Sequence, residues 1–137
     1  MTEIESVRVG IDLVMVSRIS ESLERFGDRF LRRVFTDCEI AYAAAAPAHT
    51  AQRLAARFAA KEATIKALRV RDHGINWRDI EVRRTESGAC EMALRGTAAE
   101  VAAECGAREF AVSLSHDGEY ATAVVITRVR GMPNDGG

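Results

Sequence analysis

The sequence has few cysteines and no long apolar run, and each shortage excludes a class of protein. Its three cysteines, Cys38, Cys90 and Cys105, are far apart and form no Cys-x-x-Cys pair. This spacing predicts neither a disulfide framework nor a zinc site, and it favours the reducing cytoplasm. No segment approaches the roughly 18 apolar residues that a membrane-spanning helix needs. The first residues, MTEIESVRVG, are acidic where a signal peptide would be basic.

An excess of charge of one sign is also lacking. The chain of 137 residues has 19 Lys and Arg against 20 Asp and Glu, so the net charge is 19 − 20 = −1. This balance argues against indiscriminate binding to nucleic acid. The hydrophobic content of 47% is typical of a chain that buries its own core. Because no repeat or linker interrupts the sequence, we expect one domain over 1–130 and a flexible tail over 131–137.

The patterns predict an α+β fold in which a long helix packs on a small, largely antiparallel sheet. A β-branched run predicts a strand over 7–16, and Ser17 offers a cap for a helix that ends at Phe26, before Gly27. A short second helix is expected to end at about Val34, and the capping box TDCE at 36–39 predicts the start of a third. Two more helices are expected, one over Thr50–Leu68 with Thr50 as its cap and one over Thr97–Cys105 that ends before Gly106. Further strands are expected over 79–84, 90–94, 110–115 and 120–129, the last two forming a hairpin across HDGE.

The long helix contains RFAAKEATIKAL, in which two charges lie where a buried face is expected. At about 100° per residue, one side of this helix gathers Leu54, Phe58, Ile65 and Leu68. Lys61 projects into the middle of that side, and Glu62 lies on its edge. In one interpretation Lys61 keeps its ammonium in water and Glu62 pairs with Lys66. In the other, Glu62 leans into a cleft and needs a cation there, because a half-buried carboxylate is otherwise costly.

Asp12 is a second carboxylate in an apolar setting, within the strand VGIDLVMV. A buried strand position normally excludes a charge. Asp12 could instead face solvent together with Gly10 and Val14, but that face is not otherwise polar. Two isolated carboxylates with hardly any His or Cys ligands suggest Mg²⁺, which completes its shell with water and phosphate. If Glu62 does lean into a cleft, the sequence predicts a magnesium site at Asp12 and Glu62 beside a phosphate-bearing ligand.

Four sequence blocks together resemble the holo-acyl-carrier-protein synthase family of phosphopantetheinyl transferases. They are GIDLVMVSRI, RVFTDCE, RFAAKEATIKAL and SLSHDGEYATAVV, which occur in the family's order within Val9 to Val129. The resemblance implies a 4′-phosphopantetheinyl transferase-like fold and a homotrimer with active sites at subunit interfaces. It also implies Mg²⁺-dependent transfer of the 4′-phosphopantetheine arm of coenzyme A to a serine of an apo acyl carrier protein, releasing adenosine 3′,5′-bisphosphate.

The resemblance further implies roles for individual residues. Asp12 and Glu62 match the metal ligands, Lys61 and Lys66 the lysines at the coenzyme A phosphates, Arg57 and His116 the contacts to the nucleotide end, and Arg18 a contact to the carrier protein. For a general base, Glu62, Asp12, His116 and a metal-bound water are all chemically suitable. A plainer interpretation of His116 is a turn residue before Asp117 and Gly118.

An arginine-rich face is expected between residues 18 and 33. At about 100° per residue, Arg18, Arg25 and Arg29 fall close together, beside an apolar side that contains Phe26 and Phe30. Such faces are ordinarily just solvated. Because acyl carrier proteins are generally acidic, this face is also suited to docking one.

Two alternatives for the function of the chain stay open. It could be a non-catalytic binding module that retains the fold, or a transferase dedicated to a secondary-metabolite carrier protein.

Overall fold

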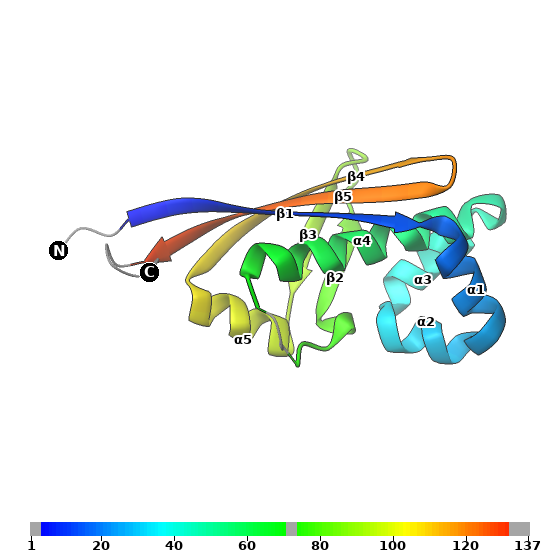
Figure 1. The fold of residues 1–137 in the computed structure, drawn as a ribbon, viewed down its shortest axis with the longest axis horizontal. Coiled ribbons are helices and arrows are strands. Elements are labelled where there is room, and N and C mark those ends of the chain that lie inside the picture. The colour runs from blue at the N-terminus through cyan, green and yellow to red at the C-terminus, as the bar shows by residue number, and fades with distance from the viewer. Residues whose placement is uncertain (1–3, 71–73, 132–137) are drawn as a thin grey trace.

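A computed structural model describes residues 4–70 and 74–131, and Figure 1 shows a long sheet running past one central helix. Strands β1 (Ile4–Met15), β5 (Tyr120–Gly131) and β4 (Ala107–Asp117) form an antiparallel sheet in the order β1-β5-β4, and β2 (Ile80–Arg84) pairs antiparallel with β3 (Cys90–Leu94). The helices are α1 (Val16–Phe26), α2 (Asp28–Val34), α3 (Asp37–Ala44), α4 (Thr50–Leu68) and α5 (Gly96–Cys105), with 3₁₀ turns η1 (Pro47–His49) and η2 (Trp77–Asp79). The α+β prediction with antiparallel pairing is therefore confirmed.

Several local predictions are confirmed by the backbone. Helix α4 has the expected bounds. The capping box at the start of α3 is complete, because Thr36 Oγ1 accepts from the Glu39 amide at 3.3 Å and Glu39 Oε1 accepts from the Thr36 amide at 2.9 Å. Gly27, with φ of 52°, separates α1 from α2, and Gly106, with φ of 75°, ends α5. A positive φ suits glycine, which has no Cβ to clash with the backbone.

Two expected caps are wrong. Helix α1 begins at Val16, so Ser17 lies inside it, and the N-cap residue Met15 makes no side-chain capping bond. Thr50 is the first residue of α4, and its hydroxyl donates to the carbonyl of Ala43 at 3.0 Å. The Thr50 side chain therefore ties α4 to α3. The strand pairing of β1 with β5 extends to Met15, which leaves no room for a cap at Ser17.

The terminal hairpin is longer than expected. Pairing of β4 with β5 continues through His116 with Ala121 to Asp117 with Tyr120. His116 is therefore a strand residue, and its interpretation as a turn residue is wrong. At the other end, Gly131 is still part of β5, and the rest of the expected tail lies outside the described residues.

Helix α4 packs directly on β1 and β5, and small residues allow the close approach (Figure 1). Ala59 and Ala63 are fully buried. A Cβ added to Gly10 would lie 1.9 Å from the carbonyl oxygen of Ala63. Only glycine therefore lets the β1 backbone lie against this turn of α4. No helix in the described residues is long and apolar enough to cross a membrane.

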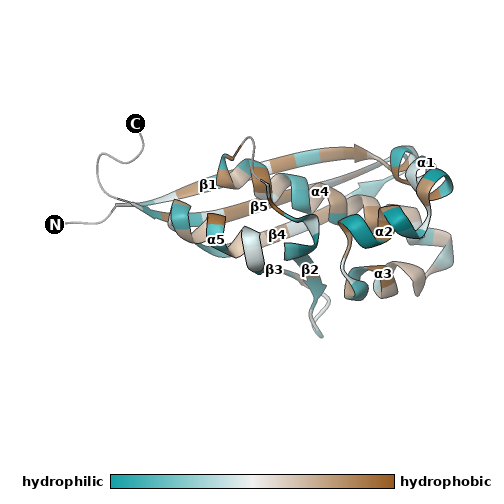
Figure 2. Cartoon of the chain, turned by 90° about the horizontal axis from the view of Figure 1, so that it is seen from below, coloured by the Kyte–Doolittle hydropathy of each residue, from teal (hydrophilic) through white to brown (hydrophobic). Residues whose placement is uncertain are grey.

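The two faces of β1 have unusual environments. Gly10 and Val14 are buried on the face toward α4, and Asp12 lies between them on the same face. The alternative in which this face is the solvent face is therefore wrong. The opposite face is apolar yet exposed, at 60–64% for Val7, Val9, Ile11 and Leu13. Figure 2 shows hydrophobic colour along much of β1 and β5 and hydrophilic bands on α1 and α2.

Candidate functional site

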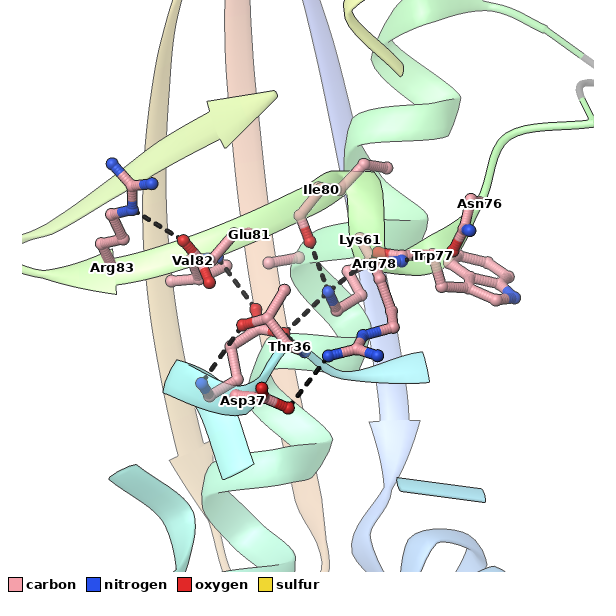
Figure 3. A network of polar contacts seen from close by, with 12 residues as sticks. Thr36, Asp37, Lys61, Asn76, Trp77, Arg78, Ile80, Glu81, Val82 and Arg83 are labelled. Atoms are coloured by element: carbon pink, nitrogen blue, oxygen red, sulfur yellow. Dashed lines mark hydrogen bonds and ion pairs between the residues drawn. The ribbon is translucent and has the colours of Figure 1, made fainter. Parts of the chain in front are cut away.

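Lys61 is completely buried, at 0% exposure, in the centre of a polar network (Figure 3). Its ammonium lies 2.8 Å from Glu39 Oε1 and donates to the carbonyl of Trp77 at 3.0 Å and to that of Ile80. The interpretation in which Lys61 keeps its ammonium in water is therefore wrong. The physical reason is that α3, η2 and β2 cover this side of α4, which the periodicity of α4 alone does not reveal.

Glu39 completes this network. One carboxylate oxygen, Oε1, accepts from the Thr36 amide, and the other, Oε2, accepts from the Val82 amide at 2.9 Å. Burial lowers the pKa of Lys61, and the charge of Glu39 and its hydrogen bond offset part of that effect. The pair therefore joins α3, α4 and β2, and the Lys61 ammonium has its donors directed at protein oxygens.

Lys66, in contrast, is half-exposed one turn further along α4. Its ammonium lies 3.0 Å from Asp12 Oδ1 and donates to the carbonyl of Ile11, also at 3.0 Å. The Asp12 side chain is 18% exposed. The Asp12 carboxylate on β1 therefore lies beside the Lys66 ammonium on α4, in a partly exposed position.

Asp12 and Glu62 line one cavity of about 470 Å³, which we call the carboxylate cavity. Its walls also contain Arg18, Ile19, Glu21, Ser22, Arg25, Phe26, Phe30 and Phe58. The structure therefore brings the expected metal ligands together with two of the three arginines of the expected docking face. Arg29 does not line this cavity; it is exposed on α2, since Gly27 interrupts the helix between Arg25 and Arg29.

The donor set of the carboxylate cavity fits magnesium. No group of three or more His, Cys, Asp or Glu side chains is placed to hold a metal ion within residues 4–70 and 74–131. Zinc sites normally need three or four such ligands, whereas Mg²⁺ is usually held by one or two carboxylates with water and substrate phosphates. Asp12 and Glu62 supply that number of carboxylates.

A second cavity, of about 640 Å³, contains the two residues expected at the nucleotide end of coenzyme A, Arg57 and His116. We call it the arginine cavity. Sequence reasoning missed four further side chains in its wall, which are Tyr42, His49, Arg53 and Arg84. The four-residue spacing of Arg53 and Arg57 does place them on one face of α4. Tyr42 and Arg84 reach the cavity from α3 and β2, which only the packing of these elements shows.

The two cavities are separate in this chain. They share no lining residue among those that the structure describes. Arg57 and Glu62 are five positions apart on α4, which turns them about 140° away from each other around the helix. The residues expected at the nucleotide end of coenzyme A and those expected at the metal therefore line two separate cavities.

Comparison with known proteins gives a consistent result. The profile of the 4′-phosphopantetheinyl transferase superfamily matches residues 8–125. A holo-[acyl-carrier-protein] synthase of Koribacter versatilis is 48% identical over 118 residues, which are 85% of this chain and 94% of the relative. A holo-[acyl-carrier-protein] synthase of Gloeobacter violaceus is also 48% identical over 118 residues, covering 86% of this chain and 89% of the relative.

Solved structures agree with the sequence relatives. The structure of the Chronobacterium ammoniagenes ACPS-CoA complex superimposes with a TM-score of 0.80 at 35% identity, covering 90% of this chain and 98% of that chain. A Helicobacter pylori holo-[acyl-carrier-protein] synthase in complex with coenzyme A has a TM-score of 0.74 at 29% identity, covering 87% and 98%. With the profile match over most of its length, this chain belongs to the 4′-phosphopantetheinyl transferase superfamily.

Proposed function

We propose that this chain is a holo-[acyl-carrier-protein] synthase, which transfers 4′-phosphopantetheine from coenzyme A to a serine of an apo acyl carrier protein. The serine hydroxyl gives its proton to a general base, the serine oxygen bonds to phosphorus, and the pyrophosphate bond from that phosphorus breaks, so that adenosine 3′,5′-bisphosphate leaves with the bridging oxygen. The observation that carries this proposal is the carboxylate cavity. Asp12 and Glu62 line it together with Arg18 and Arg25, which supports a metal site next to a basic docking surface.

Asp12 and Glu62 are the proposed magnesium ligands. When bound, the ion would neutralise charge that develops on the phosphoryl oxygens during transfer. Lys66 is the proposed phosphate contact, because its ammonium is half-exposed and already lies next to Asp12. Lys61 is left out of the phosphate-binding set, since its ammonium is buried and paired with Glu39.

The arginine cavity is the proposed site for the nucleotide end of coenzyme A. Arg57 and His116 line it as the family resemblance implies, and no Asp or Glu is among its lining residues. A cavity with several guanidiniums and no carboxylate favours a ligand that carries phosphates.

Arg18, Arg25 and Arg29 are the proposed contacts to the carrier protein. All three are exposed, and the first two border the cavity in which transfer would occur. Phe26 is also exposed, at 53%, beside the Arg25 guanidinium. A basic surface with an apolar centre suits an acidic partner and steers its approach.

A homotrimer is proposed as the assembly. Two observations support it: the apolar outer face of β1 is exposed, and the two cavities lie apart in one chain. Such an apolar face normally marks an interface. Contact between subunits through this face would allow the arginine cavity of one subunit to adjoin the carboxylate cavity of the next. We also propose the cytoplasm as its location, in keeping with three free cysteines.

The test is a transfer assay with the full chain, coenzyme A, Mg²⁺ and an apo acyl carrier protein, followed by intact mass measurement of the carrier. A gain of one phosphopantetheinyl group is expected. A protein that binds the carrier but never modifies it, across a panel of fatty-acid and secondary-metabolite carriers, would instead be a binding module. The panel also identifies the preferred acceptor.

A further inference from the structure

One aromatic ring in the arginine cavity contacts three guanidiniums from two different elements. Tyr42 is on α3, Arg53 and Arg57 are one turn apart on α4, and Arg84 is the last residue of β2. The guanidinium carbons of Arg53 and Arg57 lie 4.0 Å and 4.1 Å from the centre of the Tyr42 ring, and that of Arg84 lies 5.8 Å away.

Hydrogen bonds fix two of the three guanidiniums to the same tyrosine. Arg53 donates from Nη1 to the carbonyl oxygen of Tyr42 at 2.7 Å, and Arg84 donates from Nη1 to the Tyr42 hydroxyl at 2.9 Å. Arg57 is only 3% exposed, and its Nε has no hydrogen-bond partner among the described residues. A buried donor without a partner is unusual and points to a missing acceptor.

No carboxylate pairs directly with the charges of this cluster in the described residues, although the charge of Glu39 acts on Arg57 from nearby. No ion pair joins Arg53, Arg57 or Arg84 to a carboxylate in the described part of the chain. Burial lowers the pKa of Arg57, and a bound anion would stabilise its charged form. Three adjacent cations repel one another, so something other than a carboxylate must hold them.

An aromatic ring can hold three neighbouring guanidiniums without cancelling their charge, which an acidic residue could not do. The face of the ring attracts a cation through its quadrupole, yet it carries no net charge. The guanidiniums are therefore held in place while their full charge stays available to a ligand. A carboxylate at this position would hold them equally well but would cancel part of the field that attracts a phosphate.

We propose that Tyr42 is a positioning residue that directs Arg53, Arg57 and Arg84 toward a phosphate group of the nucleotide bound in the arginine cavity. The proposal rests on the proposed function for the identity of that nucleotide as coenzyme A. Tyr42 itself acts through the arginines, by its ring and by its hydroxyl.

The test compares Tyr42→Leu and Tyr42→Phe with the wild-type chain. Binding of coenzyme A and of adenosine 3′,5′-bisphosphate is measured by calorimetry, and kcat and KM are measured for both substrates. We expect Tyr42→Leu to weaken binding of coenzyme A about tenfold and to raise its KM similarly, the scale of cation–π contacts and charged hydrogen bonds. The kcat and the KM for carrier protein should stay nearly unchanged. Tyr42→Phe keeps the ring and should restore most of the affinity.

Further variants guard against a purely structural effect. Tyr120→Leu alters the other tyrosine of the chain, which is 47% exposed and lines neither cavity, and it should leave binding unchanged. Arg84→Met should weaken binding more in the wild-type background than in the Tyr42→Phe background, because Phe no longer holds the Arg84 guanidinium through a hydroxyl. Equal losses in the two backgrounds would mean that the hydroxyl does not position Arg84, and this comparison also serves if Tyr42→Leu does not fold. Dephospho-coenzyme A identifies the phosphate: an unchanged Tyr42→Leu effect with this ligand indicates the pyrophosphate, and a lost effect indicates the 3′-phosphate.

The outcomes separate the two proposals. A wild-type chain that binds neither coenzyme A nor adenosine 3′,5′-bisphosphate contradicts the proposed function. A wild-type chain that binds them, with a Tyr42→Leu variant that melts at lower temperature but binds equally well, overturns the positioning role and leaves the proposed function intact.

Discussion

Among single residues, Asp12 and Glu62 are carboxylates that two different elements, β1 and α4, bring to one cavity. Both line the cavity that also holds Arg18 and Arg25, and Asp12 is largely shielded by the packing of β1 on α4. Both carboxylates can therefore meet a ligand that enters this cavity.

Removal of either charge tests this role. We expect Asp12→Asn and Glu62→Gln to lower turnover at least ~100-fold, because a metal ligand is lost and transition-state charge is no longer stabilised. Lys66→Ala should lose less, and added Mg²⁺ should not restore it. Glu104→Gln, on the exposed surface of α5, is the matched control and should keep full activity. A folded Glu62→Gln variant with a near-normal rate at saturating Mg²⁺ would show that Glu62 binds no metal.

Glu81 gives a prediction about acid stability. Burial alone would raise the pKa of this carboxyl, but hydrogen bonds from Thr36 and Arg83 and the charges of Arg83 and Arg95 bring it below its ordinary value of 4.5. A lowered pKa in the folded state means that the ionised carboxylate stabilises the fold fully above 4.5, and that this contribution is lost as pH falls below 4.5 and through the lower pKa of the folded state.

The stability of Glu81→Gln should therefore depend less on pH than that of the wild type. Urea denaturation from neutral pH down through 4.5 measures the difference. We expect the variant to be less stable at neutral pH and the gap to narrow in acid. A gap that stays constant across the range would mean that the charge of Glu81 does not stabilise the fold.

At the scale of elements, the buried pair of Lys61 and Glu39 links α4 to α3 and β2. Removing one partner leaves the other charge buried without compensation, which typically costs about 3–5 kcal/mol. We expect Lys61→Met to lower the free energy of unfolding by about that amount, measured by chemical denaturation. Lys66→Met, at the half-exposed pair with Asp12, is the control and should cost about 1 kcal/mol or less. The double variant Glu39→Gln/Lys61→Met should recover part of this loss. If it is as unstable as Lys61→Met alone, an uncompensated buried charge is not the cause of the loss.

Helix α1 carries the prediction about the carrier protein. Arg18 and Arg25 are exposed on this helix and border the carboxylate cavity. Reversal of both to Glu should raise the KM for carrier protein about tenfold or more, while the KM for coenzyme A stays nearly unchanged. Steady-state kinetics at two ionic strengths measures both KM values. High salt should weaken the affinity for carrier protein more in the wild type than in the double variant. Equal effects on both substrates would indicate misfolding or a docking surface elsewhere.

At the scale of the whole molecule, the exposed apolar face of β1 leads to a prediction about assembly. Val9 and Leu13 are more than 60% exposed, at 62% and 63%, on a strand that is otherwise well paired with β5. If this face joins subunits, Val9→Glu/Leu13→Glu should shift a trimer toward monomer in light scattering at micromolar concentration. Turnover should fall together with the trimer fraction, because the two cavities would no longer adjoin.

A control on the opposite side of the molecule keeps this experiment specific. Glu100→Lys on exposed α5 changes charge without touching β1 and should remain trimeric. A wild-type chain that is a monomer at micromolar concentration would contradict the trimer. A double variant that dissociates but keeps full activity would contradict an active site shared between subunits.

Features that depend on neighbours along the chain could be predicted from the amino-acid sequence. The bounds of α4, the capping box of Thr36 and Glu39, and the helix ends at Gly27 and Gly106 follow from hydrogen bonds and φ angles within a few residues. The blocks around Asp12 and Glu62 likewise predicted the family before any packing was known.

How those elements cover one another, in contrast, depends on their packing in three dimensions. Helical periodicity places Lys61 on the apolar side of α4, but whether it reaches water depends on α3 and β2, which cover it. Alternation along β1 separates two faces, but it cannot show that the face with Asp12 packs inside while the apolar face of Val9 stays exposed. Tyr42 meets Arg53 and Arg84 only because three elements converge. Burial and charge compensation depend on contacts between segments distant along the chain, and a pattern within one segment does not contain them.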